Sequence, residues 1–147
     1  MTSESARGSN STMPLWIRAL SRLPFWLLYA LAAVLSLLLR YVLRYRIGVA
    51  RSNLQSSFPD LAPARIESIL NSYYWRLGQI VVECLKLVSI SADELRRRVT
   101  FTNLPLVQRE IDAGRSVILL AAHLGNWEWQ LQGVVVQFQT PIDAAYK

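Results

Sequence analysis

The residues best suited to chemistry in this chain are His123 and Glu128, five positions apart near the carboxyl end. His123 is the only histidine in the protein. A carboxylate beside a neutral imidazole fixes the ring tautomer and raises its basicity, so that the ring can take a proton from a hydroxyl. The pair therefore predicts a general base and its orienting acid. The alternative is structural: the histidine caps a strand end, and the glutamate complements the positive end of a helix.

The sequence around this pair is typical of a strand–turn–helix unit. Residues 116–122 form a continuous apolar run, which predicts a strand buried on both faces. Asn126 is a suitable N-cap for a helix over about 127–138, and residues 142–146 begin another extended segment. Strand, helix and strand in this order predict a βαβ unit, whose ligand site lies at the carboxyl ends of the strands. His123 occupies that position.

The amino-terminal part predicts a membrane anchor. Residues 23–39 contain no charged residue, and aromatic residues lie towards both ends of this run. Seventeen helical residues span roughly 25 Å, against a hydrocarbon core of roughly 30 Å, and the run extends further if Arg40 reaches the interface. We therefore expect a disordered tail over 1–13 and an anchor over 14–46, in preference to a cleaved signal peptide or a buried core helix. The sequence leaves open whether the anchor spans the bilayer or lies in its interface.

The charge distribution supports that anchor. The chain has 147 residues and a formal net charge of +6. Residues 1–51 hold seven arginines and one acid, whereas residues 52–147 hold nine basic and nine acidic residues. A membrane flank explains this better than a nucleic-acid-binding face, so no nucleic acid is expected as a partner. More arginines follow the apolar run than precede it, which places the carboxyl-terminal side in the cytoplasm.

A long helix over about 63–88 is predicted by apolar residues at helical spacing. Glu83 lies on another face. A functional role is one interpretation, but we favour a carboxylate with Gln79 and Lys86 as its neighbours on the helix. Cys84 lies in the apolar stripe without a basic neighbour and is interpreted as a core residue rather than a nucleophile. A single cysteine excludes an internal disulfide, and a single histidine excludes His-pair zinc motifs.

The shorter expected elements complete the chain after the anchor. They are a polar connection over 51–60, a short helix or turn over 91–98, a strand over 99–102 and a helix bracketed by Asn103 and Gly114. The run Arg96–Arg98 is expected to be a solvated face, with contact to anionic head groups as the alternative.

The six residues from His123 to Glu128, His-Leu-Gly-Asn-Trp-Glu, resemble the His-x4-Asp/Glu motif of glycerolipid acyltransferases. The form is that of the bacterial lipid A late acyltransferases, the lauroyl- and myristoyl-transferring enzymes of lipopolysaccharide synthesis. Also similar to that family are residues 51–59, Glu83 and residues 113–120, so that the likeness covers most of the chain after residue 14. It implies an α/β fold: a membrane helix, then the start of a glycerolipid-acyltransferase-like domain over 47–147. Family members are longer, so we expect a truncated chain that holds only the amino-terminal half.

The resemblance also implies residue roles and partners. His123 becomes the general base and Glu128 its orienting partner, while Gly125, Asn126 and Trp127 contribute to substrate binding. The acceptor is a hydroxyl of a lipid A precursor, and the donor is a fatty acyl thioester on acyl carrier protein or coenzyme A. No cofactor and no metal are expected. The enzyme would lie at the bacterial inner membrane with its catalytic part on the cytoplasmic side.

Two alternatives remain at this point. The same chemistry could act on another glycolipid, such as a phosphatidylinositol mannoside, or on an ornithine lipid. A non-catalytic membrane adaptor would instead use the helix over 63–88 to bind a partner, and His123 would be structural.

Overall fold

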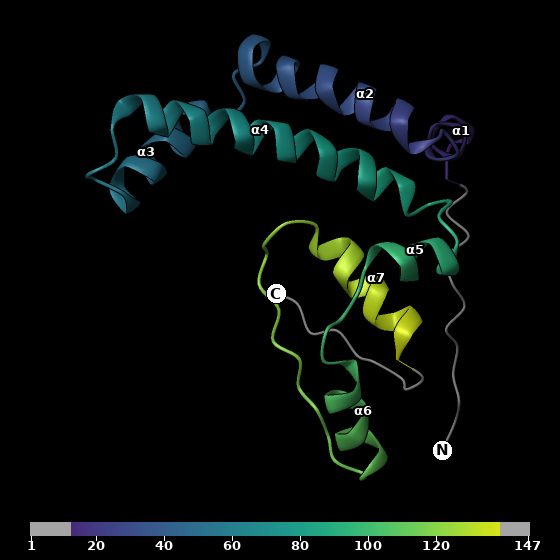
Figure 1. Cartoon of the computed structure of the whole chain (residues 1–147). Coiled ribbons are helices and arrows are strands. Elements are labelled where there is room, and N and C mark those ends of the chain that lie inside the picture. Colours follow the sequence, from purple (N-terminus) through teal and green to yellow (C-terminus); the bar gives the residue numbers. More distant parts are fainter. Residues whose placement is uncertain (1–12, 139–147) are drawn as a thin grey trace, which may run out of the picture.

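The computed structural model describes residues 13–138, and within that range it consists of helices without any β-strand (Figure 1). The helices are α1 (Leu15–Ser21), α2 (Phe25–Leu37), the π-helical turn η1 (Leu38–Val42), α3 (Ile47–Ser57), α4 (Pro63–Lys86), α5 (Ala92–Arg98), α6 (Leu104–Asp112) and α7 (Trp127–Gln137). The expected α/β class is therefore not confirmed for this part of the chain. The expected tail, apart from Met13, and the strand over 142–146 lie outside the described residues.

The centre of the fold is an antiparallel pair formed by α2 and α4 (Figure 1). Every fourth residue of α2 and η1 faces α4 and is buried: Leu28, Ala32, Ser36 and Arg40. The helices approach closely at Gly78, where an added Cβ would lie 2.6 Å from the carbonyl oxygen of Ala32. The small side chains at this crossing thus set the distance between the two helices.

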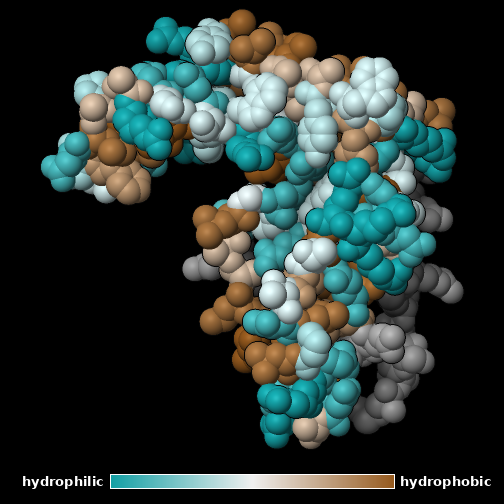
Figure 2. Space-filling view, viewed as in Figure 1, coloured by the Kyte–Doolittle hydropathy of each residue, from teal (hydrophilic) through white to brown (hydrophobic). Residues whose placement is uncertain are grey.

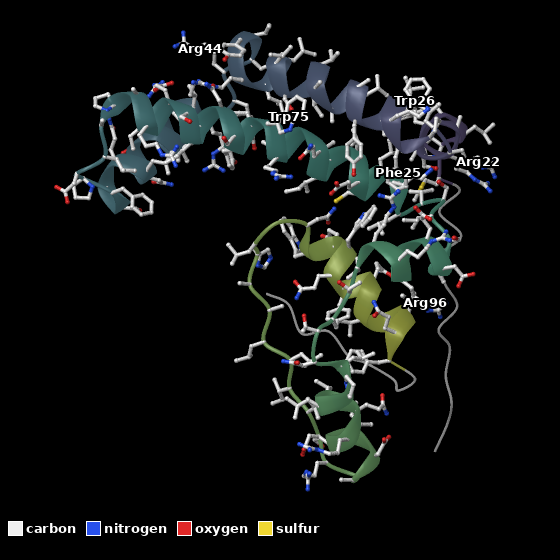
Figure 3. The ribbon with its side chains drawn as sticks, viewed as in Figure 1. Arg22, Phe25, Trp26, Arg44, Trp75 and Arg96 are labelled. Atoms are coloured by element: carbon white, nitrogen blue, oxygen red, sulfur yellow. The ribbon has the colours of Figure 1, made fainter. Side chains whose placement is uncertain are left out.

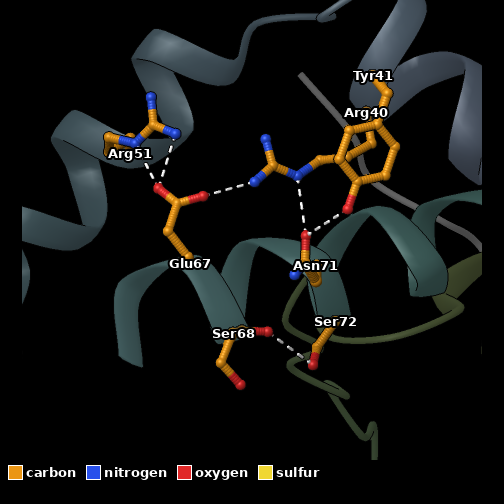
Figure 4. Close-up of polar contacts among 7 residues, drawn as sticks. All are labelled: Arg40, Tyr41, Arg51, Glu67, Ser68, Asn71 and Ser72. Carbon is orange, nitrogen blue, oxygen red and sulfur yellow. Dashed lines mark hydrogen bonds and ion pairs between the residues drawn. The ribbon is translucent and has the colours of Figure 1, made fainter. Parts of the chain in front are cut away.

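Polar contacts join this pair from end to end. At one end, Ser89 Oγ donates to the carbonyl of Ser21 (2.6 Å), and Lys86 Nζ donates to that of Leu23 (2.9 Å). At the other, Arg40 donates to Asn71 Oδ1 (3.0 Å) and forms an ion pair with Glu67 (2.6 Å) (Figure 4). These contacts hold the two helices in register.

The prediction of a polar connection over 51–60 is wrong, because most of this segment belongs to α3. The apolar side chains of α3 pack against the start of α4, around the buried residues Ile66, Leu70 and Tyr74. Arg51 of α3 also pairs with Glu67 at 2.7 Å (Figure 4). Packing and this ion pair outweigh the weak helix preference of the Ser- and Asn-rich sequence.

The expected helices in the second half are confirmed. Helix α4 spans Pro63–Lys86, and Ser91 caps α5 by accepting the Glu94 N–H (3.2 Å). Helix α6 ends before Gly114, whose φ of +73° lies in the left-handed region that glycine adopts without strain. The arginines of α5 are exposed, and each pairs with an acid of the same helix.

The two strands expected in the described part, over 99–102 and 116–122, are absent. The second is also not buried: Ile118 is 86% exposed and Leu120 is 96% exposed. A buried parallel strand needs backbone partners on its neighbours, and no described residue supplies them. Among residues 13–138 the apolar run therefore belongs to no sheet.

The expected anchor over 14–46 is divided in the structure. Pro24 separates α1 from α2, and the left-handed residues Arg44 and Arg46 follow η1. The stretch Phe25–Val42 is long and apolar enough to cross a bilayer, and 22% of it is buried. Membrane helices share this length and composition with the core helices of soluble proteins and with signal sequences.

Candidate active site

The motif that contains the histidine leads into the first turn of α7. Asn126 is the N-cap, and its Oδ1 accepts the backbone N–H of Trp129 at 3.1 Å. The predicted cap and the helix over about 127–138 are thereby confirmed. Gly125 precedes the cap with a φ of +67°, so glycine is favoured there by backbone conformation. No described atom lies within 4 Å of a Cβ built at Gly125, so within this part of the chain its backbone conformation, and not close packing, favours glycine there.

His123 and Glu128 lie on different elements and make no hydrogen bond with each other in the described structure. His123 is exposed on the segment before α7, and its ring centroid lies 4.7 Å from that of Trp127. Glu128 is half-buried in the first turn of α7. The structure thus brings the imidazole to Trp127 and leaves the predicted base–acid contact unformed.

Glu128 lies close enough to α4 for its charge to affect the pKa of the Cys84 thiol. Burial, the largest effect, raises the pKa of the Cys84 thiol, and the charges of Glu128 and Glu83 raise it further. A nucleophilic cysteine needs the opposite shift, so the interpretation of Cys84 as a core residue agrees with its surroundings.

Glu83 is a further candidate functional residue, because its contacts reach both α2 and the start of α7. Its Oε2 accepts the Asn126 Nδ2–H (2.7 Å), and its Oε1 accepts the Tyr29 hydroxyl (3.0 Å). Its backbone carbonyl accepts the indole N–H of Trp129 at 2.8 Å. One residue of α4 therefore contacts α2 and two positions at the start of α7.

Neither Gln79 nor Lys86 bonds to the Glu83 carboxylate in the described structure, so the favoured interpretation is wrong. Arg76 donates to Gln79 (3.1 Å), and Lys86 donates to the carbonyl of Leu23. The signal that could have identified Glu83 is its position between Val82 and Cys84, beside the apolar stripe. A carboxylate there needs hydrogen-bond donors from another segment.

Aromatic packing holds α7 against the rest of the molecule. Trp129 is buried and meets Phe25 of α2 edge to face, with centroids 6.0 Å apart. The guanidinium of Arg98 in α5 lies 3.7 Å from the Phe25 ring centre. Phe25, which contacts both α5 and α7, is labelled in Figure 3. Trp129 is thus a packing residue that orients the first turn of α7.

The family assignment rests on a match over almost the whole chain. Residues 12–147 match the family model described as bacterial lipid A biosynthesis acyltransferase. The chain belongs to this acyltransferase family, as the His123–Glu128 motif indicates. No curated protein and no solved structure gives a significant match to it.

Proposed function

We propose that this chain supplies the catalytic base of a membrane-bound O-acyltransferase that acts on a hydroxyl of a lipid A precursor. The observation that carries the proposal is the coincidence of the family match with an exposed His123 directly before α7. An exposed imidazole is accessible to a lipid hydroxyl, whereas a structural histidine is normally buried and hydrogen-bonded.

His123 would remove the proton of the acceptor hydroxyl while that oxygen attacks the thioester carbonyl. The new C–O bond forms a tetrahedral oxyanion, whose collapse breaks the C–S bond. The thiolate then leaves with the proton that the imidazolium returns. Of the two backbone amides near the ring, Leu124 N–H already donates to the carbonyl of Ala122 (2.8 Å), so Gly125 N–H is our candidate oxyanion donor.

Glu128 would orient the imidazole once a side-chain rotation brings its carboxylate to the ring. Until then, the ring of Trp127 limits the positions of the imidazole. Both ends of the Asn126 amide are already bonded, to Trp129 N–H and to Glu83, so we assign Asn126 the task of holding the turn beside the substrate. In this arrangement the backbone of residues 123–128 positions the reacting groups.

The donor would be an acyl thioester on acyl carrier protein or coenzyme A, and the site would face the cytoplasm at the inner membrane. Membrane association is supported by the mostly exposed apolar stretch Phe25–Val42. A site tethered to the bilayer gains effective concentration towards a lipid acceptor. The adaptor hypothesis is less well supported, because the apolar stripe of α4 is occupied by α2 and α3.

Acyl transfer to a lipid A precursor by the full-length protein in membranes tests the proposal. His123→Gln should lower kcat by about a hundredfold or more, because the general base is lost. The protein should stay membrane-bound, since glutamine roughly keeps the volume of the side chain. Gln132→Ala, an exposed substitution on α7, is the matched control. Full activity of His123→Gln would contradict the mechanism.

A further inference from the structure

The structure bears on how the apolar amino-terminal helices meet the membrane, a question that rests on the membrane association proposed above. The side of α1, α2 and η1 that faces away from α4 is covered with large exposed apolar side chains. They are Leu15, Trp16, Trp26, Leu31, Val34, Leu37, Leu38, Tyr41 and Val42. Figure 2 shows apolar surface along the upper edge, over α2. We call this surface the α1–α2 face.

Helix α4 cannot enter the hydrocarbon beside α2. It carries polar or charged side chains along its whole length, from Glu67 to Lys86. Its middle is level with the middle of α2, because Gly78 meets Ala32 and Ser36. Arg76, two positions from that crossing, is exposed. If α2 crossed the bilayer with α4 attached, this arginine would lie near the bilayer centre, where a charge is most costly.

Helix α2 cannot cross alone without dismantling the pair. Separation would break the contacts of Arg40 with Glu67 and Asn71, of Tyr29 with Glu83 and of Lys86 with the Leu23 carbonyl. The side chain of Arg40 is only 9% exposed, so it would lose its counter-charge inside an apolar span. The helices therefore act as one body with one apolar side.

Basic residues flank the α1–α2 face at both ends. Arg18 and Arg22 lie near the start of α2, and Arg44 and Arg46 follow η1 (Arg22 and Arg44 are labelled in Figure 3). No ion pair joins any of the four to an acid among residues 13–138, in contrast to the arginines of α5. Cations at both ends of an apolar face complement the anionic head groups of one leaflet.

We propose that the α1–α2 face lies in the plane of an anionic phospholipid leaflet, and that α2 and η1 do not cross the bilayer. Both ends of the pair are then on the same side of the membrane. A spanning α2 would place α1 and α3 on opposite sides.

The test is the sidedness of two introduced thiols in the full-length protein. Met13→Cys lies before α1 and Ser56→Cys lies on α3, both at exposed positions, in a Cys84→Ser background. A membrane-impermeant maleimide is applied to intact spheroplasts and to inverted membrane vesicles, with detergent-solubilised protein showing that both thiols react. Labelling of both sites in inverted vesicles, and of neither in spheroplasts, is expected. Labelling of the two sites from opposite sides of the membrane overturns the proposal. Labelling of both sites in spheroplasts alone would keep the α1–α2 face in one leaflet and would overturn the cytoplasmic side assigned under the proposed function.

Vesicle binding separates this proposal from the membrane association on which it rests. Purified protein is mixed with preformed vesicles of phosphatidylcholine, with and without phosphatidylglycerol. The double variant Arg44→Gln/Arg46→Gln should bind the anionic vesicles about tenfold more weakly. Arg109→Gln/Arg115→Gln, which removes the same charge from the α6 region, should bind like the wild type. Failure of the wild type to bind any vesicle refutes membrane association itself, whereas binding without a difference between the two variants refutes the assigned surface alone.

Discussion

The amide of Asn126 donates to the carboxylate of Glu83 across 2.7 Å, joining the N-cap of α7 to the last turn of α4. The two residues are 43 positions apart in the sequence. The same amide oxygen accepts the N–H that begins α7. The position of the turn that carries His123 therefore depends on a residue of α4 that never contacts the imidazole.

Replacing Glu83 should loosen the start of α7. Glu83→Ala removes the acceptor of Asn126 and Tyr29 and should cost about 1–3 kcal/mol in the free energy of unfolding. Glu83→Gln keeps one acceptor oxygen and should cost less. Denaturant unfolding gives both values, and amide exchange in α7 shows where protection is lost. Equal stability of Glu83→Ala and the surface control Glu110→Ala would contradict this role.

Asn126→Asp separates the cap from the contact with Glu83. Aspartate caps helices as well as asparagine, but here it puts a second carboxylate next to that of Glu83. We expect Asn126→Asp to be less stable than the wild type near pH 7 and to recover as one of the two acids is protonated. Thermal unfolding across the acidic pH range measures this recovery. A variant as stable as the wild type at neutral pH would show that only the cap matters.

Gly78→Ala should force α2 and α4 apart. The added methyl group meets the Ala32 carbonyl at 2.6 Å, a backbone atom that cannot rotate away. We expect a loss of about 1–3 kcal/mol, typical of overpacked cores. Gly48→Ala is the matched control, because its Cβ meets nothing within 4 Å on the exposed side of α3. Thermal unfolding of both variants tests the prediction, and equal stability would exclude close packing at Gly78.

The ion pairs of Glu67 make stability depend on pH. Its hydrogen bond from Arg51, and then that from Arg40, hold the pKa of Glu67 below its ordinary value of 4.5. A depressed acid pKa stabilises the fold at pH above the unfolded value, and this is lost as pH falls through the folded pKa. The stability advantage of the wild type over Glu67→Gln should therefore be greatest above pH 4.5 and shrink below it. Unfolding of both proteins at several pH values tests this, with Asp60→Asn as an exposed control.

The reactivity of the Cys84 thiol should depend on the charge of Glu128. Burial and the nearby acids raise the pKa of the thiol, so a soluble maleimide should react with Cys84 more slowly than with a free thiol. Glu128→Gln removes one of these charges and should speed the reaction, because more thiolate is present at a given pH. Glu110→Gln should leave the rate unchanged. An unchanged rate in Glu128→Gln would show that its carboxylate does not face α4.

Local signals in the sequence were sufficient for the helices of the second half. The stripe from Ile66 to Val88 predicted α4, and Asn126 and Gly114 marked helix ends by side-chain capping and by positive φ. These features act within a few residues of one another. The family likewise follows from the contiguous motif and the match that surrounds it.

Tertiary contacts decided the rest, because they join residues that no local pattern connects. Residues 51–57 are helical since α3 gains a core and an ion pair with α4. The apolar run 116–122 is not a strand in the described structure, because sheet hydrogen bonds require partners from elsewhere. Glu83, interpreted from the sequence as a carboxylate beside Gln79 and Lys86, instead bonds to the start of α7. By itself the sequence determined the motif, the helix ends and the apolar amino terminus, whereas only the tertiary structure decided which face of α2 stays exposed and what holds the histidine-bearing turn.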